Sequence, residues 1–164
     1  MANSTARIEV YFGLGSNLGD RDINLLRAMN MMDEAFGTHP ERISRIVETP
    51  AWGFDGPPFL NMCVMYRLVA GESARSHALE ILDRVKEIER ALGRTEELQF
   101  DAGGRRIYHN RIIDIDILCY GGERINCDTL TVPHPLIGQR DFVKIPLREI
   151  SKPALRSAFP ELFD

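Results

Sequence analysis

The sequence predicts an α+β domain with elements in the order β-α-β-β-α-β. Apolar residues alternate along four segments, as in half-buried strands, and recur at helical spacing along two others. Glycine or proline separates most of these segments. Of the 164 residues, 44% are hydrophobic and 27% are charged, and the composition does not shift along the chain. We therefore expect one domain spanning residues 1–164.

The first strand is predicted over residues 8–14 and runs into a glycine-rich turn, residues 13–20. A helix follows and ends at Gly37. Its apolar residues are Leu25, Leu26, Met29, Met32, Ala35 and Phe36. A glycine-rich turn before a helix can cradle a phosphate. This turn lacks the P-loop lysine and the dinucleotide fingerprint, so a helix cap from Asn17 or Asp20 is the favoured interpretation.

Two further strands are predicted over residues 42–48 and 59–69. The loop between them, residues 49–58, places Trp52 and Phe54 among glycines and prolines. Polar residues are the default in such a loop. The aromatic side chains therefore indicate either a lid that faces a ligand or packing onto the domain.

The second helix is predicted over residues 73–92, with Gly93 as its C-cap. Its predicted core face consists of Leu79, Leu82, Val85, Ile88 and Leu92. Lys86 and Glu89 lie one turn apart on this helix. By default such a pair is solvated.

Residues 94–109 form the longest segment without periodicity and carry Arg94, Arg105 and Arg106 beside a pair of glycines. A basic, glycine-containing loop of this length is suited to closing over phosphates. Disorder is the alternative.

The most specific feature is a strand over residues 111–118 in which two aspartates alternate with isoleucines. Side chains alternate along a strand, so Asp114 and Asp116 share one face at a separation of roughly 7 Å. Two such anions need a compensating cation. A pair of Mg²⁺ ions fits, because Mg²⁺ binds through one or two carboxylates and substrate phosphates. The alternative is an edge strand with a solvated polar face.

The chain beyond this strand contains a turn and a possible ligand wall. Gly121 and Gly122 predict a hairpin turn. His134 next to prolines would usually be structural, but Arg140 and Phe142 follow closely in the sequence. This grouping favours a wall of a binding site.

Composition excludes several classes. A net charge of −4 argues against general nucleic-acid binding. No apolar run has the length of a membrane span or a signal peptide, so we expect a soluble, cytoplasmic protein. Cys63, Cys119 and Cys127 are odd in number and lack metal-type spacing, which predicts reduced, packed thiols.

A series of short motifs resembles one family nearly from end to end, in that family's order. The motifs are residues 13–20, Thr49-Pro50, residues 59–61, Ile88-Glu89, Gly93-Arg94, residues 111–118, and residues 130–135 with Arg140 and Phe142. The family comprises the pyrophosphokinases that transfer diphosphate from ATP to 6-hydroxymethyl-dihydropterin in folate biosynthesis. The resemblance implies a ferredoxin-like α+β sandwich and in-line attack by the pterin hydroxymethyl oxygen on the β-phosphorus of ATP.

The resemblance also implies residue roles. Asp114 and Asp116 would hold two Mg²⁺ ions on ATP, and Arg94 and Arg111 would contact the phosphates during transfer. The residues assigned to the pterin are Gly15, Thr49, Trp52, Phe59, Asn61 and Phe142. The positions that would contact ATP are Lys86, Glu89, Ile117, Thr131, His134 and Arg140. We expect a monomer that acts on these two small molecules.

The chain departs from the family pattern at a few positions. The first lid loop reads Thr49-Pro50-Ala51-Trp52-Gly53, where many relatives have a second proline and a leucine. Lys86 lies where glutamine is familiar, Tyr108 where tryptophan is familiar, and Pro135 where some have tyrosine. Two other functions share parts of the pattern. A ferredoxin-like binding module without catalysis would not need the paired aspartates. A two-metal nuclease or phosphatase would require further metal ligands.

Overall fold

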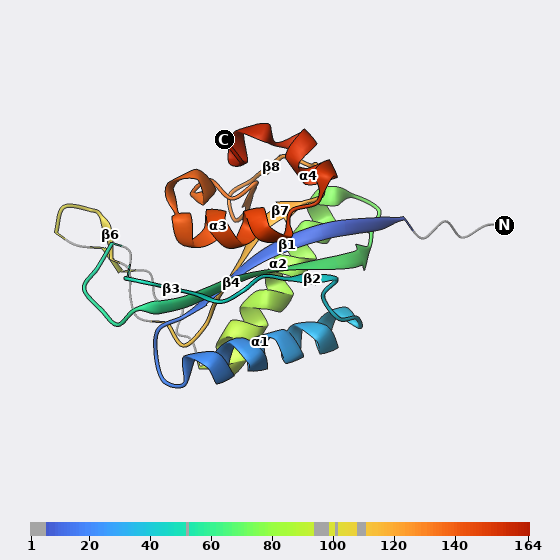
Figure 1. The fold of residues 1–164 in the computed structure, drawn as a ribbon. Helices are drawn as coiled ribbons and strands as arrows, with labels where there is room; N and C mark the ends of the chain where they lie inside the picture. Colours follow the sequence, from blue (N-terminus) through green and yellow to red (C-terminus); the bar gives the residue numbers. More distant parts are fainter. Residues whose placement is uncertain (1–5, 52, 94–98, 101, 108–110) are drawn as a thin grey trace.

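The computed structural model describes residues 6–51, 53–93, 99–100, 102–107 and 111–164 (Figure 1). The strands are β1 (Arg7–Ser16), β2 (Arg42–Ile43), β3 (Val47–Thr49), β4 (Phe59–Val69), β5 (Gln99–Phe100), β6 (Arg106–Ile107), β7 (Asp114–Tyr120), β8 (Ile125–Asn126) and β9 (Thr131–Val132). The helices are α1 (Arg21–Phe36), α2 (Ala74–Ala91), α3 (Asp141–Ile150) and α4 (Pro153–Ala158), with short 3-10 turns at Ile137–Gln139 and Pro160–Leu162.

The central sheet has five strands. Four of them are neighbours in the order β2-β4-β1-β7, and the fifth, β3, pairs with a different part of β4 from the part that pairs with β2. Neighbouring strands in this sheet are antiparallel. Two small antiparallel pairs, β5-β6 and β8-β9, lie outside it. The α+β prediction is confirmed, with the sequence order β-α-β-β-α-β preserved around the central sheet.

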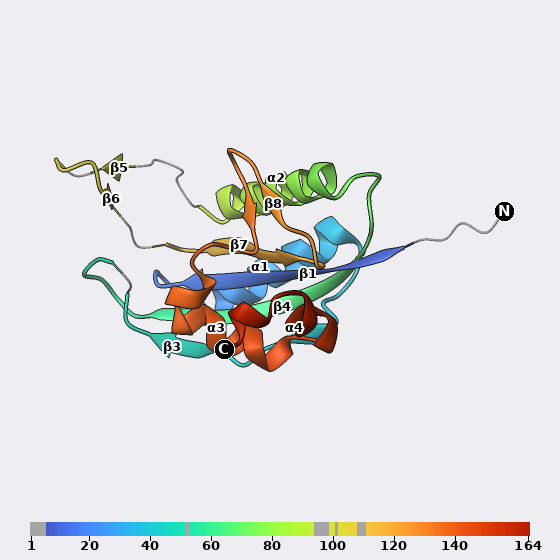
Figure 2. The ribbon, with the colours of Figure 1, turned by 90° about the horizontal axis from the view of Figure 1, so that it is seen from above.

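Helices cover both faces of the sheet. Figures 1 and 2 show α1 and α2 on one face and α3 and α4 on the other. Val10, Phe12 and Leu14 of β1 belong to the core beneath α1 and α2. Tyr11, between them, packs instead into the second core with residues of α3 and α4. Side chains that alternate along β1 therefore pack into two separate cores, one on each face of the sheet.

A β-bulge interrupts the pairing of β1 with β7. Tyr11 pairs with Cys119, whereas Phe12 pairs with Ile117, so Leu118 is the extra residue. Leu118 and Cys119 both pack into the core under α3 and α4, while Ile115 and Ile117 face the opposite core. The aspartates that alternate with these isoleucines consequently lie on the face that carries α3.

Several predicted boundaries were wrong. β1 continues through Ser16, because Gly13 and Gly15 pair with both neighbouring strands rather than forming a turn. The strand predicted over residues 42–48 is divided into β2 and β3. The aspartate strand begins at Asp114. The predicted hairpin turn at Gly121 and Gly122 is confirmed, because Tyr120 and Glu123 form an antiparallel bridge across it and the Glu123 amide donates to Tyr120 O at 3.0 Å; β8 then pairs with β9.

The helices match the predicted spans more closely. Gly37 adopts the left-handed conformation that ends α1, and the Ser73 side chain accepts a hydrogen bond from the Ser76 amide at the start of α2. Leu26 of α1, however, is 55% exposed, although it belongs to the apolar residues at helical spacing. The predicted stripe of α2 holds at Val85, Ile88 and Leu92, whereas Leu79 and Leu82 are only partly buried.

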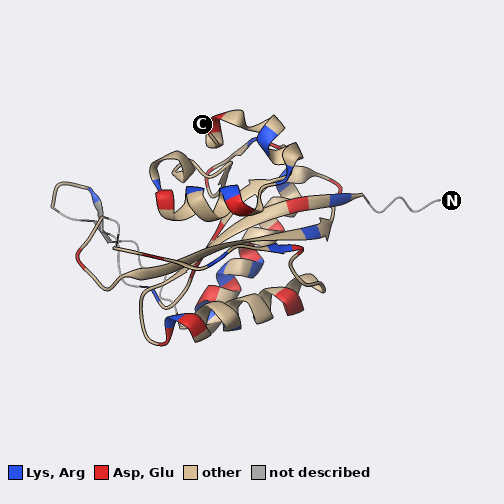
Figure 3. Cartoon of the chain, in the orientation of Figure 1, with Lys and Arg blue, Asp and Glu red and all other residues tan. Residues whose placement is uncertain are grey.

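Charged residues of both signs are interspersed along α2 and α3 (Figure 3). Cys63, Cys119 and Cys127 are free, as predicted; the first two are buried and Cys127 is half-buried. Within the described residues, no helix is long and apolar enough to cross a membrane.

Candidate functional site

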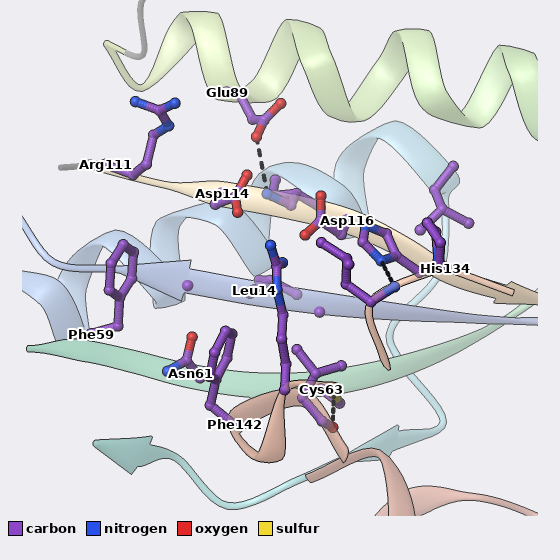
Figure 4. A pocket seen from close by; sticks show the side chains of 18 of the residues that line it. Leu14, Phe59, Asn61, Cys63, Glu89, Arg111, Asp114, Asp116, His134 and Phe142 are labelled. Atoms are coloured by element: carbon purple, nitrogen blue, oxygen red, sulfur yellow. Dashed lines mark hydrogen bonds between the residues drawn. The ribbon is translucent and has the colours of Figure 1, made fainter. Parts of the chain in front are cut away.

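A cavity of about 420 Å³ opens on the α3 side of the sheet and extends past the edge of β7 toward α2. Every predicted site residue that the structure describes lines it: Gly15, Thr49, Phe59, Asn61, Lys86, Glu89, Arg111, Asp114, Asp116, Ile117, Thr131, His134, Arg140 and Phe142. The other two, Trp52 and Arg94, lie outside the described residues. Residues far apart in the sequence thus meet in one place (Figure 4).

The floor of the cavity consists of two cross-strand rows. Each row runs from β7 through β1 to β4. The first row consists of Asp114, Gly15 and Asn61, and the second consists of Asp116, Gly13 and Cys63. Glycine in the middle of each row leaves open space between the acid and its counterpart on β4. A Cβ atom on Gly15 would lie 2.9 Å from Oδ1 of Asn61. A side chain at this position would therefore force the Asn61 amide to shift.

One end of the cavity is lined by aromatic side chains and by one side-chain amide. Phe59 and Asn61 project from β4 and Phe142 from the first turn of α3 (Figure 4). The Asn61 side chain is 7% exposed, and its Nδ2 donates to Oγ1 of Thr49 at 2.8 Å. This bond fixes the orientation of the amide. Phe54 meets Phe59 edge to face with a centroid separation of 6.3 Å, so the loop aromatic residue faces the cavity.

The acidic part of the site lies on β7. Asp114 and Asp116 are half-buried, whereas Ile113, Ile115 and Ile117 are buried on the other face, as the alternation predicts. β7 is also the last strand of the sheet, as the alternative interpretation expected. Its polar face lines a cavity, however, and is not simply solvated.

Glu89 of α2 protects the free edge of β7. Its Oε2 accepts a hydrogen bond of 3.0 Å from the Ile115 amide, which points away from β1 (Figure 4). Glu89 is only 2% exposed, so the default interpretation of a solvated charge pair with Lys86 was wrong. The carboxylate satisfies a buried backbone donor located between the two aspartates.

His134 is held as a neutral imidazole. Its Nδ1 accepts a hydrogen bond of 3.2 Å from the Leu136 amide, and its own amide donates to Leu118 O at 2.8 Å. Burial, reinforced by the positive charge of Arg140 and opposed by Asp114, lowers the pKa of His134 below its ordinary value. Because Nδ1 is an acceptor, Nε2 carries the proton and is available as a donor.

Arg140 adds a cation next to the aromatic end. Its guanidinium carbon lies 5.7 Å from the centre of the Phe142 ring. The arginine also lines the same cavity as the two aspartates. It therefore links the aromatic part of the site to the acidic part.

Sequence reasoning missed part of the wall. Leu82 of α2 and the segment Cys127, Asp128 and Thr129 between β8 and β9 also line the cavity. No spacing or composition signal marks these residues, because the fold alone brings the β8-β9 connection over the edge of β7. A helix cap from Asn17 or Asp20 was favoured; Asp20 takes the N-cap position without a side-chain bond, and the Asn17 side chain bonds to the backbone of Pro57 and Arg111.

The donor set fits magnesium bound together with a phosphorylated ligand. Within the described residues, no group of three or more histidine, cysteine or acidic side chains is placed to hold a metal ion. Two carboxylates from one strand are nevertheless what Mg²⁺ requires when phosphate oxygens and water complete its octahedron.

Residues 11–152 match the profile of 7,8-dihydro-6-hydroxymethylpterin-pyrophosphokinase (HPPK). The chain belongs to this family. The 2-amino-4-hydroxy-6-hydroxymethyldihydropteridine pyrophosphokinase of Porphyromonas gingivalis is 41% identical over 144 residues, covering 87% of this chain and 90% of that protein. The mitochondrial folate synthesis bifunctional protein of Pisum sativum is 38% identical over 150 residues, covering 91% of this chain and 26% of its own length.

A solved structure supports the fold assignment. The crystal structure of HPPK-DHPS in complex with substrates aligns with a TM-score of 0.61 at 15% identity, covering 95% of this chain and 43% of that one. The predicted ferredoxin-like α+β sandwich is thereby confirmed. As a member of the HPPK family, the protein transfers diphosphate from ATP to the hydroxymethyl group of 6-hydroxymethyl-7,8-dihydropterin in folate biosynthesis and releases AMP.

Proposed function

We propose that the cavity is the active site of this transfer, with the pterin at the end formed by Phe59, Asn61 and Phe142. ATP would extend along β7 toward α2, where it meets Lys86, Glu89, Ile117, Thr131, His134 and Arg140. The observation that carries this proposal is the meeting in one cavity of all the described residues assigned from the family motifs. Trp52 and Arg94 keep their predicted roles as part of the proposal.

The division of the cavity follows from its chemistry. Two aromatic rings suit the faces of a flat heterocycle, and the fixed amide of Asn61 suits its polar edge. The phosphates need cations and donors instead, which Arg111, the Nε2 of His134 and Arg140, the link between the aromatic and acidic parts, supply. The reacting groups would meet over Gly15, between these two regions.

The transfer needs no protein nucleophile. The hydroxymethyl oxygen forms a bond to the β-phosphorus, the bond from that phosphorus to the oxygen bridging to the α-phosphorus breaks, and AMP leaves with that oxygen. His134 cannot take the alcohol proton at Nδ1, because that atom accepts from the Leu136 amide. In the proposed step the proton passes to solvent, and the protein contributes by positioning and by neutralising charge.

Asp114 and Asp116 would hold two Mg²⁺ ions. When bound, the ions would neutralise the charge of the triphosphate. The two carboxylates themselves are fixed by their strand, by the glycine row beside them and by the bond between Glu89 and Ile115. This rigidity would set the position of the phosphates relative to the pterin.

The central test measures AMP formed from ATP, with and without hydroxymethyl-dihydropterin. Asp116→Asn should reduce turnover by about 10²-fold or more, as loss of electrostatic stabilisation of a developing charge commonly does. Circular dichroism should remain unchanged, because the substitution also relieves repulsion between two anions. Glu123→Gln, an exposed acid beyond the end of β7, is the matched control. Full activity in Asp116→Asn would exclude the proposed metal role.

A second test separates the two ends of the cavity. Phe142→Ala should weaken pterin binding by about tenfold through lost stacking. Asn61→Ala should weaken it similarly, because polar groups on the pterin edge lose their partner. ATP affinity should change little in either variant. Titration calorimetry with each ligand alone would reveal a wrong assignment if ATP affinity fell by the same factor.

We further propose that the protein acts as a monomer in the cytoplasm and as one domain over residues 1–164. Support for the monomer is that one chain supplies all the described residues assigned to the cavity. Light scattering coupled to gel filtration would test the oligomeric state directly.

A further inference from the structure

The turn after β1 buries an asparagine between two segments that border the cavity. Asn17 is 2% exposed and does not itself line the cavity. It follows directly on β1, the strand that supplies Gly13 and Gly15 to the floor. The sequence favoured a cap for α1 at this turn. Among the described residues, Asp20 takes the N-cap position but makes no side-chain capping bond.

One side of Asn17 holds the start of the aspartate strand. The side-chain Oδ1 of Asn17 accepts a hydrogen bond from the backbone N–H of Arg111 at 2.6 Å, and the backbone N–H of Asn17 donates to Arg111 O at 2.9 Å. This reciprocal pair fixes the backbone of a residue that lines the cavity three positions before Asp114. The partners are 94 positions apart in the sequence.

The other side of Asn17 holds the end of the loop that precedes the aromatic residues. Its Nδ2 donates to Pro57 O at 3.1 Å. Arg21, in the first turn of α1, adds a bond from its guanidinium to Pro58 O at 2.9 Å and an ion pair with Glu48 at 2.9 Å. These contacts hold both ends of the loop, at Glu48 just before it and at Pro57 and Pro58 just before Phe59.

We infer that Asn17 is a positioning residue that fixes the pterin end and the phosphate end of the active site relative to each other. A single amide supplies one acceptor and one donor, and each serves a different wall of the cavity. Because the reaction requires the pterin hydroxyl and the β-phosphorus to meet in line, a shift of either wall lowers the rate. This inference rests on the proposed assignment of the two ends.

The experiment compares four variants by steady-state kinetics. Asn17→Ala removes the side-chain bond to each wall, leaving only the backbone bond from residue 17 to Arg111 O, and should raise KM for the pterin and lower kcat, each by about tenfold. Asn17→Asp keeps an acceptor for the Arg111 amide but loses the donor to Pro57, so KM should rise while kcat stays within about threefold. Arg21→Ala loosens only the loop and should raise KM by about threefold.

The matched control is Asn24→Ala. Asn24 is also a buried asparagine beside the same turn, 8% exposed, and its Nδ2 donates to Ser16 Oγ and Leu18 O. Through these bonds Asn24 contacts neither the loop before Phe59 nor the start of the aspartate strand at Arg111. Its loss should lower Tm but leave KM and kcat within about twofold of the wild type. A purely structural Asn17 would behave in the same way.

Hydrogen exchange supplies a second readout that does not depend on activity. Asn17→Ala should accelerate exchange in peptides covering residues 53–59 and 111–116, whereas Arg21→Ala should affect only the first. Equal kinetics of Asn17→Ala and Asn24→Ala, or unchanged exchange in both segments, would overturn the inference. Failure of the proposed site would appear differently, as unchanged pterin binding in Phe142→Ala.

Discussion

The chemistry of each site residue depends on what lies opposite it across the sheet. Gly15 lies between Asp114 and Asn61, so its missing side chain connects the acidic and aromatic parts of the cavity. Asn61 itself would be an ordinary buried amide without Thr49, which orients its Nδ2. The reactive geometry therefore rests on residues that are individually unremarkable in the sequence.

Gly15→Ala should weaken pterin binding by about tenfold, because the new Cβ atom would lie 2.9 Å from Oδ1 of Asn61 and force that amide to move. Gly13→Ala is the control on the same strand face, since its nearest atom, Cδ1 of Leu118, lies at 3.4 Å. Pterin titration of both variants tests this expectation. Equal affinities would show that Asn61 adapts without consequence.

At the scale of elements, the edge of β7 and the face of α2 form one unit. The outward amide of Ile115 would be an unsatisfied donor at the sheet edge without Glu89. Helix α2 therefore both covers the core and completes the hydrogen bonding of the strand that carries Asp114 and Asp116. A buried carboxylate is suited to this task, since it accepts from a backbone donor where water is excluded.

Glu89→Ala should destabilise the protein by about 1–3 kcal/mol, because it leaves the Ile115 amide buried and unpaired. Exchange of that amide should accelerate, and turnover should fall as the aspartates lose their support. Glu87→Ala, an exposed position on the same helix, should change stability by less than about 0.5 kcal/mol. Urea unfolding and amide exchange provide the measurements; equal stability of the two variants would contradict the edge role.

At the scale of the whole molecule, the sheet separates two cores, and the cavity that gathers the assigned residues opens beside the core under α3 and α4. Two histidines on this framework are kept neutral. His77, whose Nδ1 lies 2.7 Å from the Tyr120 hydroxyl, and His134 both have a pKa lowered by burial. His77 of α2 contacts Tyr120 of β7, and the His134 amide donates to Leu118 O of β7, so each histidine joins β7 to a neighbouring segment.

Acidification should therefore destabilise the fold. The unfolded histidines take up protons near pH 6.5, while the folded ones resist until the pH reaches their lowered pKa. Between those values the unfolded state binds more protons, so the free energy of unfolding falls as the pH falls from about 6.5 toward the lowered pKa of the folded histidines. Urea unfolding across this range should show the decrease. Replacing both histidines with glutamine should flatten it, and an unchanged slope would assign the effect to other groups.

The sequence by itself determined the element types and the shared face of Asp114 and Asp116. These features depend on local periodicity, since alternation along a strand fixes which side chains share a face. Glycine and proline marked the ends of most elements for the same local reason.

Only the tertiary structure decided which faces meet. The bulge at Leu118, the row through Gly15, the burial of Glu89 and the two ties of Asn17 all depend on pairing register and long-range contacts. Asn17 and Glu89 were misjudged because a polar side chain next to a helix has local partners available, and the sequence favours those. The folded chain instead gives both side chains to distant backbone groups, because those buried donors and acceptors have no water to bond.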